Sequence, residues 1–475
     1  MITAHSSERS FNQRDQELFA RLSGDHNPMH TDAVAARRLM FGGPVVHALN
    51  TVTWSLDSLS KVLPSFGSLT QIRATFPAAL LVGDRALLTW NVGNKVAEAT
   101  VNVGDQTVAY LEVHFGPETE GETVLDREIP IQPCLEVEPH NMPMASGSVD
   151  LEFSSTLANQ IIPNLYNRLS SVQLAVLLAT TRIVGMRCPG LHSIYSRLNL
   201  TFEEQSKSQE LDYSVTKWDP RSGLTSLGLT APGVAGNIGC FYRPTPVKQP
   251  SINEVLSTVE PGQFSEHSAL VVGGSRGLGA LTAKLIAAGG GNVMVSYATG
   301  GLDAEQLADE VRTSSAKGTI STCQLDVLEE LESLPSLTMP YTHIYYFATP
   351  RIRGGRSAEF DRALFREYLT YYVEGAGRVL DRVIPIATED ACFIWPSTIF
   401  VEDQPEQFPE YVAAKVRGEI WCAEMERALP GLNFIRPRLP RLETDQTRSL
   451  QPVQTEDNLT VILALCAPDR RKSLT

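Results

Sequence analysis

Hydrophobic and polar residues follow the same order twice in the first half of the chain. Residues 15–24 and 44–59 have the apolar spacing of helices, and residues 69–115 then alternate between apolar and polar through GD and GN turns. A second helical stretch, 162–186, is again followed by alternating segments within 191–233. A period of two is typical of half-buried strands. The pattern predicts two similar α+β domains, each with a long helix followed by an antiparallel meander.

The last part of the chain has a different rhythm. The apolar run SALVVGG enters a glycine-rich turn, the helical stretch LGALTAKLIAAG follows, and NVMVSY is a second apolar strand. Four later segments of strand character keep this spacing, namely TISTCQLDV, THIYYFATP, ACFIWPS and LNFIRP. Strands that alternate with helices favour an α/β fold with a Rossmann-type, doubly wound parallel sheet.

Two segments rich in proline, glutamate and small polar residues are predicted to be linkers, residues 117–148 and 244–266. They separate three domains, at 1–116, 149–243 and 267–475. This agrees with the length of 475 residues, which suits about three domains.

The chain is acidic, with 40 Lys and Arg against 54 Asp and Glu and a formal net charge of −14. This balance argues against nucleic acid or an anionic membrane as a partner. The seven cysteines are scattered without a CxxC pair, so we expect neither a disulfide framework nor a metal site. No basic and apolar leader opens the sequence, and no apolar run is long enough to span a membrane. We therefore expect a cytoplasmic protein.

The stretch SGDHNPMHTD places Asp25 and His30 in a loop that Gly24 and Pro28 keep out of regular helix. Adding water to an α,β-enoyl thioester needs a base for the water and an acid for the α-carbon, and a carboxylate beside an imidazole supplies such a pair. The developing enolate also needs backbone donors, which Gly43 and the start of the apolar helix after it can supply. A lone pair of this kind is more often structural, with Asp25 capping a helix and His30 in a loop.

With the following FGGPVVHAL, however, the motif resembles a whole signature, SGD-x-NP-x-H-x-D and then FG-x-x-x-x-H-G. This is the signature of the MaoC-like hydratases, the (R)-specific enoyl-CoA hydratases of hot-dog fold. The resemblance covers about residues 10–116. It implies that Asp25 and His30 are the catalytic pair and that Asn27 is a polar residue supporting the site.

The same resemblance assigns Asn27, Gly43 and His47 to substrate binding. Ala48 stands where the family has glycine, which alters the pocket floor near the acyl chain. The second domain lacks the motif, although LHSIYSRLNLTFEE is similar to the central strand of a hot dog. We interpret it as a degenerate half that completes a double hot dog and forms one wall of the acyl tunnel. His192 and Tyr195 are interpreted as buried strand residues.

The run VVGGSRGLGALTAKL contains a GxxxGxG pattern between an apolar strand and a helix. Glycines let the backbone approach a pyrophosphate, whose charge a helix N-terminus stabilises. A glycine-rich turn alone is as often structural as functional. The candidate cofactor-binding residues of this turn are Gly273, Ser275, Arg276, Gly277, Leu278 and Gly279.

Tyr411 and Lys415 lie four residues apart in YVAAK, on one face of a predicted helix, with Ser397 upstream at the end of a strand. An ammonium at this spacing lowers the pKa of the phenol, which can then exchange a proton with a carbonyl oxygen that the serine polarises. Taken singly, YxxxK is an ordinary helix pattern. Together with the glycine turn and Asp326 after the third strand, these residues resemble the short-chain dehydrogenase/reductase family over about residues 265–445.

That resemblance implies Ser397 as carbonyl polariser, Tyr411 as acid/base, Lys415 as its activator and a ligand of the cofactor, and Asp326 as an adenine contact. No acidic residue follows the second strand in SYATG, and Arg276 can pair with a 2′-phosphate, so NADP (NADPH) is favoured over NAD.

Two departures from the family put the proton relay behind the lysine in doubt. Tyr346, Phe347, Ala348 and Thr349 replace the family's NNAG, and Tyr372 stands in place of the usual asparagine. The hydride-transfer groups themselves remain.

A hydratase and a 3-oxoacyl reductase share one intermediate, and fusion raises its local concentration. We therefore expect a bifunctional enzyme acting on acyl-CoA or acyl-carrier-protein substrates, with the resemblance implying a homo-oligomer. Two alternatives stay open. The hot-dog region can be an acyl-binding module that presents the chain to the reductase, or the last domain can be a scaffold that binds NADP without turnover.

Overall fold

The computed structural model divides into two compact units, residues 1–245 with 449–452, and residues 246–448 with 453–475. The border at 245 falls inside the second predicted linker. The residues that the structure describes are 3–63, 66–117, 124–203, 208–330, 340–356, 359–450 and 453–467. The outermost ends of the first and last predicted domains, 1–2 and 468–475, lie outside them.

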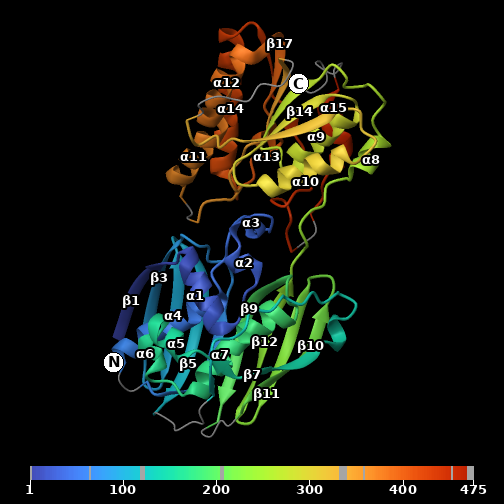
Figure 1. Ribbon diagram of the computed structural model, residues 1–475. Coiled ribbons are helices and arrows are strands. Elements are labelled where there is room, and N and C mark those ends of the chain that lie inside the picture. Colours follow the sequence, from blue (N-terminus) through green and yellow to red (C-terminus); the bar gives the residue numbers. More distant parts are fainter. Residues whose placement is uncertain are drawn as a thin grey trace. The chain divides into compact units, whose positions relative to one another are not determined.

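The first half of unit 1 packs a long helix against antiparallel strands (Figure 1). Helix α4 has no buried charge among its inward-facing residues, and its leucines, Val52 and Trp54 are packed into the core. Its elements are β1 (Thr3–Ser10), α1 (Gln13–Ser23), α2 (Pro28–Thr31), α3 (Ala33–Ala36), α4 (Ala48–Val62), β2 (Ser68–Thr75), β3 (Arg85–Val92), β4 (Val96–Val103) and β5 (Gln106–Gly116).

The second half repeats the order of helix and then strands. Its central helix, α7, is buried around its whole circumference and continues into a π-helical turn, η2. Its elements are β6 (Leu125–Asp126), η1 (Met142–Met144), β7 (Ser146–Asp150), β8 (Glu152–Phe153), α5 (Ser155–Ile161), α6 (Pro163–Tyr166), α7 (Ser171–Arg182), η2 (Ile183–Arg187), β9 (Ser193–Phe202), β10 (Glu210–Asp219), β11 (Leu224–Ala231) and β12 (Val234–Tyr242). The first predicted linker therefore carries short elements of its own, β6, η1 and the start of β7.

Both halves share one ten-stranded sheet, in the order β1-β3-β4-β5-β2-β9-β12-β11-β10-β7. The halves meet where β2 pairs antiparallel with β9, with Ile72 opposite Leu200 and Ala74 opposite Leu198. One continuous apolar core runs through both halves. The second half thus pairs the edge of β2, which would otherwise carry unpaired backbone groups.

Unit 2 contains a six-stranded sheet whose pairs are all parallel, in the order β15-β14-β13-β16-β17-β19. This is the strand order of a doubly wound Rossmann-type sheet, as the alternation of strands and helices predicts. Separate apolar clusters cover its two faces. Its elements are α8 (Ile252–Leu256), β13 (Ser268–Val272), α9 (Gly277–Ala288), β14 (Asn292–Tyr297), α10 (Gly301–Arg312), β15 (Thr319–Gln324), β16 (Tyr341–Tyr346), α11 (Arg362–Leu369), η3 (Thr370–Gly375), α12 (Ala376–Val383), η4 (Ile384–Ile386), β17 (Ala387–Ile394), β18 (Ser397–Thr398), α13 (Phe400–Asp403), α14 (Pro409–Ala428), β19 (Leu432–Ile435), β20 (Arg438–Leu439) and α15 (Asn458–Cys466).

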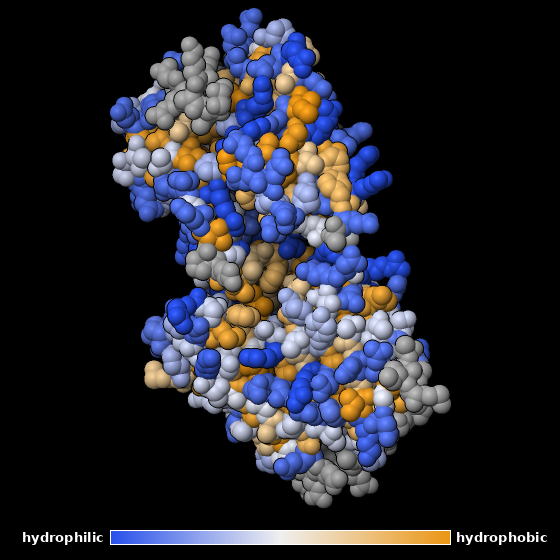
Figure 2. Space-filling view, turned by 180° about the vertical axis from the view of Figure 1, so that it is seen from behind, coloured by the Kyte–Doolittle hydropathy of each residue, from blue (hydrophilic) through white to orange (hydrophobic). Residues whose placement is uncertain are grey.

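The face of the molecule in Figure 2 carries mainly hydrophilic residues, with hydrophobic ones in small groups. The long apolar segments of the sequence are inside the two units. Within the described part of the chain, every helix is too short or too polar to cross a bilayer.

Candidate active sites

The segment after α1 brings Asp25 and His30 to the same place, but His30 lies in a short helix and not in a loop as predicted, because Pro28 starts that helix. Helix α1 ends in Gly24, whose positive φ of 76° is the left-handed cap that glycine adopts without strain. Asn27 then caps the short helix α2, which starts at Pro28 and carries His30 in its last turn. The side chains of Asp25 and His30 are buried, and both line a cavity of unit 1.

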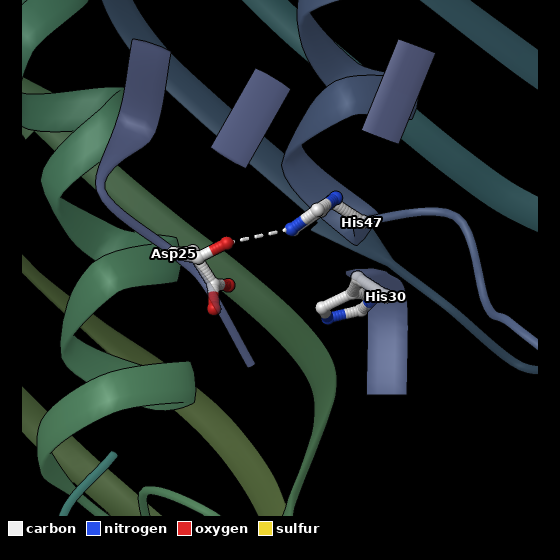
Figure 3. Close-up of side chains that lie close together, drawn as sticks. All are labelled: Asp25, His30 and His47. Carbon is white, nitrogen blue, oxygen red and sulfur yellow. Dashed lines mark hydrogen bonds between the residues drawn. The ribbon is translucent and has the colours of Figure 1, made fainter. Parts of the chain in front are cut away.

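His30 is held so that one ring nitrogen stays free. Its Nδ1 lies 2.7 Å from the carbonyl oxygen of Val45, which can only accept, so Nδ1 carries the proton in the neutral ring. Burial lowers the pKa of His30, although the charge of Asp25 opposes this. Figure 3 shows a ring nitrogen of His30 facing the Asp25 carboxylate. A neutral imidazole with its Nε2 lone pair in the cavity is a competent base.

His47 stacks on the His30 ring, with the ring centroids 3.8 Å apart. Its Nε2 lies 3.0 Å from the carbonyl oxygen of Asp25 (Figure 3). Its Nδ1 lies 2.9 Å from Oε1 of Gln16. Burial holds the pKa of His47 well below its usual value. His47 does not line the cavity, so it holds the loop in place behind the pair rather than contacting the space in front of it.

Asp25, His30 and His47 are also the group of the described residues best placed for a metal ion, with ligand atoms within 4.8 Å of one another. Both nitrogens of His47 are already engaged by protein oxygens. Because His47 therefore has no nitrogen left to bind an ion, the three residues form a poor site for a transition metal. The arrangement fits an acid/base pair better.

The Asp25 carboxylate is fixed at both oxygens. The backbone N–H of Asn27 donates to Oδ1 at 3.2 Å, and the Thr181 hydroxyl donates to Oδ2 at 2.6 Å. Thr181 belongs to α7, in the half without the motif, and Gly185 of η2 lies directly against the same carboxylate. Sequence reasoning missed both residues, since nothing in the local sequence marks them.

Asn27 supports the site instead of lining it. Its Nδ2 donates to the carbonyls of Gly185 and Gly190, at 3.0 and 3.2 Å, and its Oδ1 accepts the N–H of Met29 at 3.1 Å. Gly43 is also absent from the cavity lining, and nothing lies within 4 Å of the place where its Cβ would be.

The cavity in front of the pair has a volume of about 260 Å³. Its wall is mostly apolar and comes from both halves, with Met29, Met40, Phe41, Val45, Val46, Phe76 and Leu80 from the first and Val184, Ile194, Tyr195 and Phe241 from the second. Ala48 lines it at the start of α4, whose N-terminus has no side-chain cap. The first N–H groups of α4 are thus available to an oxyanion. Tyr195 lines the cavity, whereas His192 bonds Glu136 at 2.7 Å.

In unit 2, the glycine turn connects β13 to α9 in the geometry of a phosphate cradle. Gly273 and Gly277 have positive φ angles of 73° and 58°. A Cβ on Gly279 would lie 2.5 Å from the carbonyl oxygen of Gly273, so only glycine lets the helix start this close to the turn. No side chain caps α9. Ser275 and Leu278 are half-buried in the same turn.

Arg276 has a partner in the protein. Its Nη1 lies 3.2 Å from Oδ2 of Asp445, and this carboxylate also accepts the N–H of Val247 at 2.8 Å. A 2′-phosphate would therefore have to compete with Asp445 for the guanidinium of Arg276.

Asp326 follows β15, is half-buried, and accepts the N–H of Leu328 at 2.9 Å.

Ser397 and Tyr411 do not face each other through their hydroxyls. Ser397 donates to Oε1 of Glu419 at 2.5 Å, and Arg438 holds Glu419 from the other side at 2.7 Å. The hydroxyl next to Tyr411 is that of Thr398, whose hydrogen bond partly offsets the rise in the pKa of the phenol caused by burial. Thr398 is a residue that sequence reasoning missed, although it is adjacent to the predicted one.

Lys415 lies one turn after Tyr411 on α14, as predicted, and is only 8% exposed. Its Nζ donates to the carbonyl of Pro396 at 2.8 Å and lies 4.0 Å from the ring centre of Tyr372 and 4.4 Å from that of Trp395. Burial lowers its pKa to about 7. The aromatic ring that replaces the family's asparagine therefore contacts the ammonium directly.

Residues 3–113 match the family model described as MaoC like domain. This part of the chain is a MaoC-like domain, which confirms the prediction from the motif around Asp25. Over 90 residues the chain is 30% identical to the peroxisomal hydratase-dehydrogenase-epimerase of Saccharomyces cerevisiae. The alignment covers 19% of this chain and 10% of that relative, so the chain spans about a tenth of its length.

Several solved structures are similar to a portion of the chain. A MaoC-like dehydratase covers 50% of this chain and 97% of its own, with 12% identity and a TM-score of 0.37. A short chain dehydrogenase from Burkholderia cenocepacia in complex with NADP covers 44% and 94%, with 17% identity and a TM-score of 0.38. A short-chain type dehydrogenase/reductase from Mycobacterium ulcerans covers 44% and 85%, with 18% identity and a TM-score of 0.39. These identities are too low to transfer an activity.

Proposed function

We propose that this chain is a bifunctional acyl-thioester enzyme. Unit 1, a double hot dog, interconverts an (R)-3-hydroxyacyl thioester and the trans-2-enoyl thioester. Unit 2 reduces a 3-oxoacyl thioester with NADPH. The acyl group is carried by CoA or by an acyl-carrier protein.

The observation that carries the hydratase part is that the carboxylate of Asp25 and the free nitrogen of His30 open into one apolar cavity. Nε2 of His30 takes a proton from the water whose oxygen bonds to the β-carbon, and the Asp25 carboxylate stabilises the imidazolium that forms. The same proton then passes from Nε2 to the α-carbon, so the pair ends in the protonation state in which it began. The first N–H groups of α4, at Ala48, stabilise the negative charge that develops on the thioester oxygen. The apolar wall holds the acyl chain and excludes bulk water.

The test is hydration of crotonyl-CoA, followed by the loss of enoyl absorbance. Asp25→Asn keeps the shape of the side chain and removes its charge, so we expect hydration to fall by about 100-fold or more. The matched control is Asp32→Asn, because Asp32 caps α3 through the N–H groups of Val34 and Ala35 and asparagine caps equally well. No hydration by the unaltered protein, or full hydration by Asp25→Asn, would refute this part.

The reductase part is supported by the glycine cradle and by Tyr411 and Lys415 on one face of α14. The turn fits a dinucleotide for two reasons. The chain passes so close to itself at Gly279 and Gly273 that only glycine fits, and no side chain caps the N-terminus of α9, so its first N–H groups can bind a pyrophosphate. When bound, the nicotinamide supplies hydride. Tyr411 gives its proton to the carbonyl oxygen, and the ammonium of Lys415 favours the phenolate that remains.

The test is oxidation of NADPH in the presence of acetoacetyl-CoA. Tyr411→Phe abolishes it if the phenol is the acid, whereas Tyr371→Phe, which removes a half-buried phenol of the same domain, leaves it intact. Saturable binding of NADPH with no oxidation over a panel of carbonyls would favour the scaffold alternative, for which the packing of Tyr372 on Lys415 is the supporting contact. Reduction without hydration would favour an acyl-binding role for unit 1.

A further inference from the structure

The catalytic carboxylate of unit 1 is held by the half that lacks the catalytic motif. The hydroxyl of Thr181, on α7, donates to Oδ2 of Asp25 at 2.6 Å, the shortest of the bonds to this carboxylate. Both side chains are buried, Thr181 at 3% exposure and Asp25 at 1%. A hydrogen bond from a neutral hydroxyl to a buried carboxylate is charge-assisted and among the stronger kinds.

The direction of the Thr181 hydroxyl is specific to this residue. Thr180, its neighbour on α7, is equally buried, but its hydroxyl donates back to the carbonyl of Leu177 at 2.7 Å, within its own helix. Thr181 instead donates out of the helix, across to the loop of the other half. The Thr180 hydroxyl also reaches the phenol of Tyr195 in the cavity wall, whereas only Thr181 of the two threonines bonds the Asp25 carboxylate.

The backbone after Thr181 brings the second half close enough for this bond. Helix α7 widens into the π-turn η2, and Gly185 in that turn lies so close to Asp25 that a Cβ there would be 2.6 Å from the carboxyl carbon. The side chain of Asn27 also ties the loop to the carbonyls of Gly185 and Gly190. Since π-turns often occur at functional sites, this irregularity supports a role for the second half beyond packing.

We propose that Thr181 is the positioning residue of Asp25: its hydroxyl fixes the rotation of the carboxylate about the Cβ–Cγ bond, so that the carboxylate faces the substrate and His30. The proposal rests on the hydratase function proposed above. It gives the degenerate half a definite part in the reaction, because that half supplies the donor that a single hot-dog domain would lack. Thr181 acts through Asp25 and needs no contact with the reacting atoms.

The experiment compares Thr181→Val, Thr181→Ser and the control Thr53→Val by steady-state hydration of crotonyl-CoA. Valine keeps the shape of threonine and removes the donor, so we expect kcat to fall by about 10- to 100-fold, with KM changing by less than about two-fold. Serine keeps the hydroxyl and restores most of kcat. Thr53→Val removes an equally buried hydroxyl that bonds the carbonyl of Asn50 within α4 and lies outside the cavity wall, so it leaves kcat near that of the unaltered protein.

Thermal unfolding of all three variants separates a loss of positioning from a loss of fold. A Thr181→Val protein that keeps its full kcat overturns the proposal, as does a Thr181→Ser protein that loses as much kcat as the valine variant. A rise in KM at constant kcat overturns it too, because that would assign Thr181 to substrate binding. Absence of hydration in the unaltered protein would instead refute the hydratase function, and the role of Thr181 with it.

Discussion

Gly185→Ala tests whether the position of the Asp25 carboxylate governs the chemistry of unit 1. The Cβ of an alanine at this position would lie closest to Oδ1 of Asp25 and 2.6 Å from its Cγ and Oδ2, well inside ordinary van der Waals contact at 3.4 Å or more. The φ of Gly185 lies outside the left-handed region, so the substitution adds no backbone strain. The clash itself is therefore the whole perturbation.

The carboxylate has to retreat by about 1 Å, and a displacement of that size costs about 100-fold in rate. It also has to stretch or break the 2.6 Å bond from Thr181, because both groups are buried and tightly packed. Overpacking a core of this kind destabilises a protein by about 1 to 3 kcal/mol. We therefore expect a folded protein with a slightly lower melting temperature and a kcat reduced by about two orders of magnitude.

The assay is hydration of crotonyl-CoA at saturating substrate, with a melting curve on the same sample. Gly431→Ala is the matched control, because nothing lies within 4 Å of its Cβ position and its φ is also unremarkable. A Gly185→Ala protein with unchanged melting and a kcat within about two-fold of the unaltered one would refute the reasoning, since the carboxylate could then move about 1 Å without consequence.

Three further predictions concern the rest of the chain. Thr398→Val is expected to slow NADPH oxidation more than Ser397→Ala does, because the Thr398 hydroxyl lies beside the phenol of Tyr411 and the Ser397 hydroxyl is bonded to a glutamate; equal rates in the two variants would contradict this. Burial lowers the pKa of His30 below 6.5, so the unfolded chain takes up the proton first and unit 1 loses stability as the pH falls below about 6.5. Urea unfolding at about pH 7.5 and about pH 5.5 measures this loss, and His30→Gln makes it smaller. Arg276→Ala is expected to weaken NADPH binding and leave NADH binding unchanged, while Asp445→Asn releases the guanidinium and strengthens NADPH binding; fluorescence titration checks both, and equal effects on the two cofactors would show that Arg276 does not read the 2′-phosphate.

Much of the candidate sites could be predicted because the residues lie close together along the chain. Asp25 and His30 are part of one short motif, and the cap at Gly24 and the proline at the start of α2 set their loop locally. The same holds for Tyr411 and Lys415, which one helical turn places on the same face of α14.

The partners of individual side chains are harder to predict from the sequence, because they depend on the direction in which each side chain points in the fold. Ser397 and Thr398 are adjacent in a two-residue strand, so their hydroxyls point in different directions. Glu419, which Arg438 holds in place, accepts the hydrogen bond of the Ser397 hydroxyl. The place of Arg276 in the glycine turn and the lack of an acidic residue in SYATG predict a contact with the 2′-phosphate of NADP. In the folded protein, however, the guanidinium is paired with Asp445, which lies far along the chain.

By itself, the sequence determined the periodicity of the strands and helices, the glycines that turns require and the candidate acid/base residues that stand within a few positions of one another. These features depend on backbone geometry and on neighbours in the chain. Only the tertiary structure decided that β2 and β9 join the two halves in one sheet, that Thr181 donates to Asp25, and that Lys415 lies between two aromatic rings. These contacts join residues far apart in sequence, and they are set by how buried surfaces pack, which no local pattern encodes.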